Sequence, residues 1–247
     1  MKSYFKMKYL FFILLIPFSL YSQDKNSLTK DHYQKLFEQI QNQYGPDQTL
    51  LNGIFYQYPY RNAKGHPFFY ENRFYHGNLV FKNILYKNLE LKFDIFNQQL
   101  ILNYIFNVNQ TQLILPTEFI SSFNIEGKQF KTVHLKEMGI AIYQVLGLND
   151  SIQCLYQWSK QRIESDHLGQ ILLYKFSFEK RRTFLFIDGE LHRYIGNRSF
   201  LKVFPENNRQ QIKKYLKSNK IEVRNSNDNI IETLMEYCSE SLKTNPE

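Results

Sequence analysis

Side chains suited to metal binding or acid–base chemistry gather in residues 65–77, GHPFFYENRFYHG. This segment and the strand pattern after it supply His66, Tyr70, Glu71, His76 and Asp94. Histidine ligands of zinc usually stand about two to five residues apart, whereas His66 and His76 are ten apart and no HExxH motif occurs. The spacing therefore favours a turn at Gly65 and a strand ending at His76 over a metal site. If the chain is catalytic, His66, His76 and Asp94 are its candidate residues.

Nucleophilic and carboxylate chemistry have less support in the sequence. No GxSxG motif and no glycine loop that would cradle phosphate occurs. A nucleophile at Cys154 would need a base, and the candidates by residue type alone are His134, His167 and His192. A carboxylate pair for glycoside cleavage would come from Glu118, Asp166, Asp188 or Glu190. Asp188 is explained by a turn with Gly189, and Asp166-His167 beside Gly169 is predicted to be a polar connection. We therefore expect no catalytic residue, no cofactor and no metal.

The first 22 residues have the pattern of an export signal. A basic start with Lys2, Lys6 and Lys8 precedes an apolar run from Leu10 to Leu20, and cleavage is expected before Gln23. The apolar run holds about 11 residues, whereas a membrane span needs about 20. No cysteine near residue 22 would accept a lipid. We expect residues 1–22 to be a signal peptide and residues 23–247 to be exported, periplasmic or secreted, without an integral membrane span.

Charge and composition restrict the partners. The chain has a formal charge of +8, and the signal accounts for three of the lysines, which leaves about +5. Export excludes nucleic acid as the usual partner, so anionic membrane or glycan surfaces are the more plausible contacts. The densest basic run, Lys180-Arg181-Arg182, is predicted to be a solvated turn. The 22 Phe and 18 Tyr suit β cores, and the single Trp weakens the case for a glycan ligand.

Cys154 and Cys238 are the only cysteines. Export permits a disulfide between them, which would contribute about 4 kcal/mol in the chain-entropy model. Both cysteines also fall on apolar stripes, so two separate buried thiols are the alternative.

The apolar pattern predicts a single mainly β (α+β) domain over residues 23–247. A helix is expected over residues 29–44, and two more follow over 206–218 and 228–242. Between these helices, apolar residues alternate with polar ones, as at Leu89, Leu91, Phe93 and Ile95, which is typical of strands. Strands are expected at 53–58, 79–81, 89–95, 100–106, 112–115, 123–133 with a turn at 126–127, 140–145, 152–162, 174–178 and 183–195 with a turn at Asp188-Gly189. We expect an antiparallel β-sandwich or partly open barrel with one N-terminal helix and a C-terminal helical segment from about residue 205.

Residues 76–95, HGNLVFKNILYKNLELKFDI, and residues 199–221, SFLKVFPENNRQQIKKYLKSNKI, together with GHPFF at 65–69, carry a resemblance. They resemble a group of uncharacterised secreted β-rich proteins of the phylum Bacteroidota. The resemblance implies a β-rich exported fold in the bacterial cell envelope, and it carries over no catalytic residues.

The expected function is that of a non-enzymatic binding or assembly module of the cell envelope. Its partner would be an envelope protein, or an apolar or glycan ligand. Assembly would use an exposed sheet edge or the C-terminal helices. The alternative is a hydrolase acting on envelope or polysaccharide material, and that alternative requires His66, His76 and Asp94 to meet in one cleft.

Overall fold

A computed structural model of the chain describes residues 47–106, 109–135, 139–147, 152–168 and 171–244, together with Lys35 and Gln39. The chain divides into two compact units, Met1–Asp47 and Gln48–Glu247, and the second contains the elements described below. The predicted signal peptide lies outside the described residues. So does the helix predicted over 29–44, apart from Lys35 and Gln39, which are helical.

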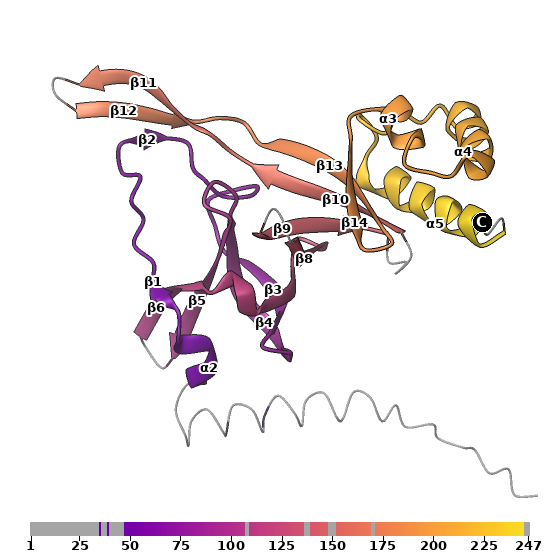
Figure 1. Cartoon of the computed structure of the whole chain (residues 1–247). Coiled ribbons are helices and arrows are strands. Elements are labelled where there is room, and N and C mark those ends of the chain that lie inside the picture. Colours follow the sequence, from indigo (N-terminus) through magenta and orange to yellow (C-terminus); the bar gives the residue numbers. More distant parts are fainter. Residues whose placement is uncertain are drawn as a thin grey trace, which may run out of the picture. The chain divides into compact units, whose positions relative to one another are not determined.

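The second unit is mainly β, as the apolar alternation predicts (Figure 1). Its strands are β1 (Ile54–Phe55), β2 (Ala63–Lys64), β3 (Tyr75–Phe81), β4 (Ile84–Asp94), β5 (Gln99–Phe106), β6 (Asn109–Leu115), β7 (Ile120–Ile125), β8 (Lys128–Leu135), β9 (Gly139–Leu146), β10 (Ile152–Ser159), β11 (Arg162–Leu168), β12 (Ile171–Phe176), β13 (Lys180–Ile187) and β14 (Glu190–Tyr194). Its helices are α2 (Gln48–Leu51), the 3₁₀ turn η1 (Thr117–Phe119), α3 (Asn197–Leu201), α4 (Glu206–Ser218) and α5 (Asp228–Thr244). Of the described helices, none is long and apolar enough to cross a membrane.

Eleven strands form one antiparallel sheet in the order β1-β6-β5-β4-β3-β7-β8-β9-β10-β13-β14. Successive hairpins build β3 to β6 in one direction, and the chain then returns through η1 so that β7 pairs with the free edge of β3. The two-residue turn predicted at Asp188-Gly189 is confirmed. Asp188 and Gly189, between β13 and β14, both have positive φ, as a two-residue primed turn requires. The β3–β7 pair joins the two halves of the sheet.

The main apolar core lies on one face of this sheet. One cluster contains Phe93, Phe123 and Phe130, and a second lies under α3, α4 and α5. Phe130 and Tyr156 both stand opposite Gln144, and directly opposed residues share a face, so the two clusters lie on the same side. Trp158 packs against both clusters and joins them.

The helical segment covers the second cluster. The predicted helices over 206–218 and 228–242 are confirmed as α4 and α5, and α3 is an additional short helix. Cys154 of β10 and Cys238 of α5 both belong to this cluster as free, buried thiols. The structure therefore has the alternative of two separate thiols rather than the disulfide.

β10 and β13 continue as a two-stranded ribbon, β11 and β12, away from the helices (Figure 1). β2 pairs in parallel with β12 to complete a three-stranded sheet. The connection predicted at Asp166-His167 is therefore wrong, because both residues belong to β11. Residues 162–165 are all exposed, so backbone pairing with β12, rather than an apolar pattern, makes this strand.

Candidate functional site

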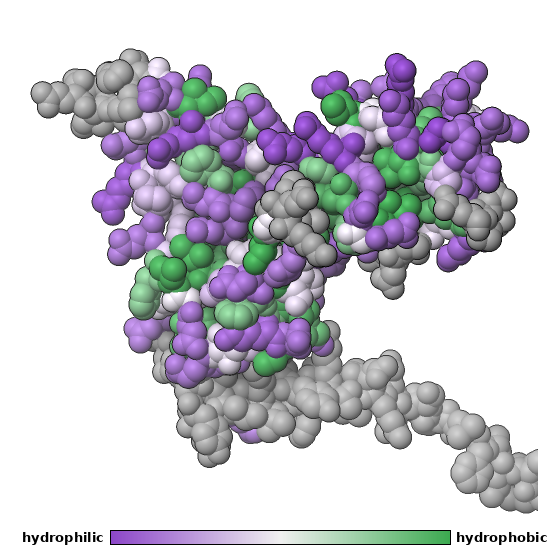
Figure 2. Space-filling model, in the orientation of Figure 1, coloured by the Kyte–Doolittle hydropathy of each residue, from purple (hydrophilic) through white to green (hydrophobic). Residues whose placement is uncertain are grey.

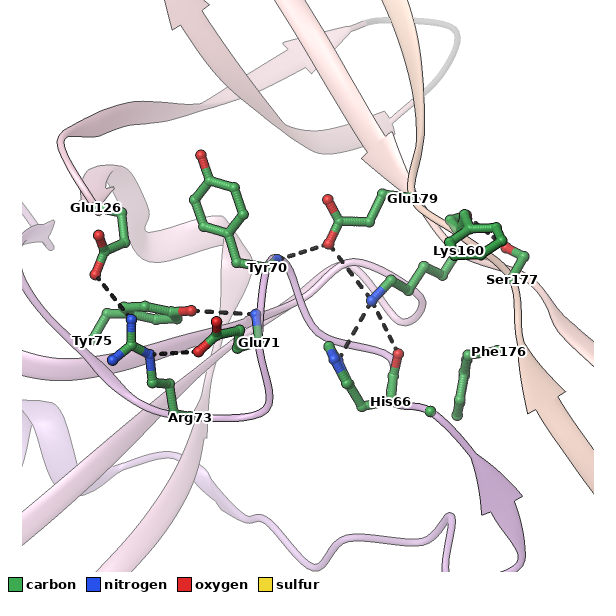
Figure 3. A pocket seen from close by; sticks show the side chains of 12 residues that line it. His66, Tyr70, Glu71, Arg73, Tyr75, Glu126, Lys160, Phe176, Ser177 and Glu179 are labelled. Atoms are coloured by element: carbon green, nitrogen blue, oxygen red, sulfur yellow. Dashed lines mark hydrogen bonds and ion pairs between the residues drawn. The ribbon is translucent and has the colours of Figure 1, made fainter.

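A pocket of about 780 Å³ opens where the segment before β3 meets the start of the β11–β12 ribbon (Figure 3). This volume lies within the roughly 300–1,000 Å³ of typical ligand pockets. Its lining residues come from parts of the chain far apart in sequence: Gly65, His66, Tyr70, Glu71, Arg73, Tyr75, Glu126, Lys160, Phe176, Ser177, Phe178 and Glu179. We call it the His66–Lys160 pocket.

Lys160 lies at the inner wall of the pocket, directly after β10. Its side chain is 7% exposed, and Nζ donates to the carbonyl oxygens of Phe68 at 2.7 Å and His66 at 3.2 Å. Nζ also lies 3.6 Å from Oε1 of Glu179. Burial lowers the pKa of Lys160, while the nearby carboxylates of Glu179 and Asp94 oppose that shift. The ammonium group therefore holds the loop of residues 66–68 against the end of β10.

Glu179 is the acidic partner of Lys160. It precedes β13, whose first residue Lys180 stands opposite Ser159, so the strand register brings Glu179 to Lys160. Its Oε1 also accepts a 2.7 Å hydrogen bond from the backbone N–H of Tyr70, a residue with φ of 58°. One carboxylate thus fixes both the lysine and the turn that carries Tyr70.

His66 lines the pocket beside Lys160 with its ring stacked on Phe68. Its Nδ1 accepts the backbone N–H of Phe68 at 3.3 Å, so the neutral ring carries its proton on Nε2. Burial, followed by the positive charges of Lys160 and Lys92, lowers the pKa of His66. The imidazole is therefore neutral at physiological pH.

The outer wall carries a second charged group, centred on Arg73. Its Nε lies 3.1 Å from Glu71 and its Nη2 lies 3.8 Å from Glu126, in the β7–β8 turn. The guanidinium also covers the ring of Tyr75 at 4.7 Å, and the Tyr75 hydroxyl accepts the backbone N–H of Glu71. Because these side chains are 48–71% exposed, the ion pairs contribute little to stability and can exchange with a ligand.

Asp94 lies outside the pocket lining, at the end of β4. Its side chain is fully buried, and its two oxygens accept hydrogen bonds from Asn97 and from the backbone N–H of Phe96. Burial raises its pKa, and the hydrogen bonds from Asn97 and Phe96 and the charge of Lys160 oppose that shift. Asp94 therefore organises the β4–β5 turn and stabilises the charge of Lys160.

His76 is separate from the other two candidates. It is exposed on β3 opposite Glu90, whose carboxylate accepts a hydrogen bond from Asn103. Asp94 pairs in the sheet with Gln99, four residues further along β4. His66 contacts Lys160 and the charge of Asp94 acts on Lys160, whereas His76 belongs to the part of β3 opposite Glu90. The hydrolase alternative lacks the shared cleft that it requires.

The other candidate residues also lie apart. Cys154 contacts the hydroxyl of Tyr194 at 3.0 Å, and burial raises the pKa of Cys154 to about 12, so its reactive thiolate does not form near neutral pH. His192 lies 3.6 Å from Glu190 at the surface of β14. Glu118 is in η1, and Asp188 is in the turn before β14. Within the part of the chain that is described, no three His, Cys, Asp or Glu residues are grouped to hold a metal ion.

Lys160, Glu179, Arg73 and Glu126 were not predicted from the sequence as site residues. One signal was present for Lys160, which continues the alternation of Cys154, Tyr156 and Trp158 onto the buried face. A charged residue at a buried strand position requires a polar or charged partner, and this requirement could have identified Lys160 as a candidate site residue. Glu179 reaches the pocket only through strand register, which has no local signal. The turn at 126–127 that carries Glu126 was predicted, but its approach to Arg73 has no local signal.

Comparison of the chain with protein-family models, with curated proteins and with solved structures finds no match in any of the three.

Proposed function

We propose that this chain is a non-enzymatic binding protein that holds a cationic, aromatic segment of a partner in the His66–Lys160 pocket. The observation that carries the proposal is that the pocket presents accessible carboxylates next to exposed aromatic rings, while its buried lysine is already paired. Lys160 is held by two carbonyl groups and Glu179, so it offers no free group for catalysis.

The accessible charge of the pocket is negative. Glu71, Glu126 and Glu179 have side chains 71%, 48% and 23% exposed, whereas the accessible positive charge is that of Arg73. A ligand that presents an ammonium or guanidinium group would therefore be attracted. Anionic ligands would meet three carboxylates.

The rim of the pocket adds aromatic surface. Phe178 is 95% exposed and Tyr70 is 38% exposed, and Phe176 also lines the pocket. Exposed aromatic rings gain contact area at little cost in conformational freedom and also attract cations to their faces. A partner segment with a basic residue next to an aromatic one satisfies both features.

Trp158 offers a way to measure binding without a label. It is the single Trp of the chain and lies 5.3 Å from Phe69, whose ring is 4.3 Å from that of Tyr70. We expect the terminally blocked peptide Lys-Phe-Lys to change the Trp158 fluorescence saturably, and the peptide Glu-Phe-Glu to leave it unchanged. Equal responses to the two peptides would contradict the proposal.

Phe178→Ser tests the aromatic rim, because a side chain 95% exposed is not needed for folding. We expect about tenfold weaker binding of Lys-Phe-Lys. The matched control is Phe55→Ser, since Phe55 is 75% exposed and lies outside the pocket. Equal affinities of the two variants would remove Phe178 from the site.

The proposed place of this binding protein is the bacterial cell envelope, in the periplasm or outside the cell. The support is the basic and apolar pattern of residues 1–22 and the resemblance of residues 76–95 and 199–221 to secreted proteins. Mass spectrometry of the protein from its own cells tests this, with Gln23 expected as the first residue. A cytoplasmic protein that retains Met1 would contradict it.

A further inference from the structure

Net positive charge is concentrated in residues 197–226, which contain α3 and α4. Residues 197–226 contain eight Lys or Arg residues and two Glu residues, a formal charge of +6, whereas the whole chain has +8. Seven of the basic side chains are exposed: Arg198, Lys202, Lys213, Lys214, Lys217, Lys220 and Arg224. We call these seven residues the α4 basic surface. Hydrophilic side chains project from this corner of the molecule in Figure 2.

The outward face of α4 carries the centre of this surface. Ile212 and Leu216 are buried against the core, four residues apart on the inner face. Lys213 and Lys217, also four apart, are exposed and therefore share a different face. The apolar side of α4 is already used in folding, so its outward side acts through charge alone.

The neighbouring helix α5 has the opposite charge on its exposed face. Glu232, Glu236 and Glu240 are exposed at four-residue spacing. Tyr237 stacks on Tyr215 of α4 at 3.8 Å and so marks the side of α5 that faces α4. The helical segment thus separates positive from negative charge, and this separation gives it a preferred orientation in an electric field.

We infer that the α4 basic surface docks onto the surface of an anionic lipid bilayer. Each Lys or Arg near such a surface contributes an attraction that several residues together make strong. This surface is separate from the His66–Lys160 pocket, which takes none of its residues from α3, α4 or α5.

The composition of the surface favours a bilayer over other anionic partners. Five of its seven residues are Lys, which acts as a hydrated point charge, whereas nucleic acid recognition favours the planar fork of Arg. Single-stranded nucleic acid also requires exposed aromatic rings, and none of the large exposed apolar residues lies within 197–226. A protein partner would need an apolar centre, which this stretch does not offer.

Vesicle sedimentation tests the inference with the full chain in the form that cells produce. We expect binding to vesicles of phosphatidylglycerol and phosphatidylcholine, no binding to phosphatidylcholine alone, and release when NaCl rises from 0.05 to 0.5 M. The triple variant Lys213→Gln, Lys214→Gln, Lys217→Gln should lower the partition coefficient roughly 100-fold.

The matched control removes the same charge elsewhere. Lys64, Lys87 and Lys175 are exposed and lie outside the helical segment. Their triple change to Gln should lower the partition coefficient by less than about fivefold. Equal effects of the two triple variants, binding to neutral vesicles, or tighter binding to duplex DNA than to the anionic vesicles would each overturn the inference. Any apolar N-terminal residues are common to all the proteins and cancel in the comparison.

Discussion

At the scale of single residues, the pocket depends on where each charge finds its counter-charge. Lys160 is buried and satisfied by carbonyl groups and Glu179, whereas Arg73 is exposed and bridges Glu71 to Glu126. The first arrangement supports the fold. The second leaves charges that a ligand can reach.

Lys160→Met should destabilise the protein by about 2–4 kcal/mol, because two carbonyl oxygens and the partly buried Glu179 lose their partner. Urea unfolding measures this free energy. Lys175→Met is the control, since Lys175 is exposed on β12, and it should change stability by less than about 0.5 kcal/mol. If the two variants are equally stable, Lys160 does not hold the loop of residues 66–68.

Arg73→Ala should tighten the binding of the Lys-Phe-Lys peptide about fivefold. The guanidinium competes with the peptide for Glu71 and Glu126, and its removal frees both carboxylates. Fluorescence titration of Trp158 measures the change. Weaker binding in this variant would show that Arg73 contacts the ligand directly and would contradict the cationic ligand.

The lowered pKa of His66 predicts how stability responds to acid. In the unfolded chain, His66 binds a proton near pH 6.5. In the folded chain His66 binds that proton only at lower pH, because burial and the charges of Lys160 and Lys92 oppose a positive imidazole more than Glu71 favours it. The stability contributed by neutral His66 is present above pH 6.5 and is lost as the pH falls through the folded value.

His66→Gln should therefore lose less stability than the wild type when urea unfolding is repeated at pH 7.5 and pH 5. The pKa of Asp94 is raised, so Asp94 changes the stability with pH in the opposite direction. Both proteins contain Asp94, so its contribution cancels when their stability losses are compared. Identical losses in the two proteins would show that His66 does not titrate abnormally.

At the scale of elements, alternation and turn chemistry predicted most strands and the two long helices. α4 begins at Glu206 and ends at Ser218, as its apolar spacing indicates, and the Asp188-Gly189 turn forms as expected. β11 was missed because its first four residues are exposed and show no apolar period. Of the pocket lining, the sequence pointed to His66, Tyr70 and Glu71. It missed Lys160 and Glu179, because they meet through the β10–β13 register, which no local pattern specifies.

The β3–β7 junction can be tested through its glycine. A Cβ at Gly77 would lie 2.0 Å from the carbonyl oxygen of Asn124 in β7, so the two strands would have to move apart. Gly77→Ala should destabilise the protein by about 2 kcal/mol or more. Gly127→Ala has open space but a φ of 71°, and it should cost about 1 kcal/mol. Calorimetric melting that gives the reverse order would contradict this register.

The first residue of α5 attaches the helical segment to the sheet. Asp228 accepts hydrogen bonds from Lys128 and, at 2.8 Å, from Gln144, and Arg181 lies 4.0 Å away. Its charge also suits the N-terminus of a helix. Asp228→Ala should therefore cost about 2–3 kcal/mol by urea unfolding, whereas Glu236→Ala on the exposed face should cost less than about 0.5 kcal/mol.

At the scale of the folded unit Gln48–Glu247, two surfaces of opposite charge character have separate positions. The His66–Lys160 pocket presents carboxylates and aromatic rings, and the α4 basic surface presents lysines. A cationic partner segment would be repelled by the second and attracted by the first. Docking of α4 on a bilayer would use none of the residues that line the pocket.

The most direct test of the central claim is a calorimetric titration of the wild type and of the Glu71→Gln, Glu126→Gln double variant with the Lys-Phe-Lys peptide. Both carboxylates are exposed, so the double variant should fold normally and bind the peptide about tenfold more weakly. Glu118→Gln, an exposed glutamate outside the pocket, should bind as the wild type does. Unchanged affinity in the double variant would contradict a cationic ligand in the His66–Lys160 pocket.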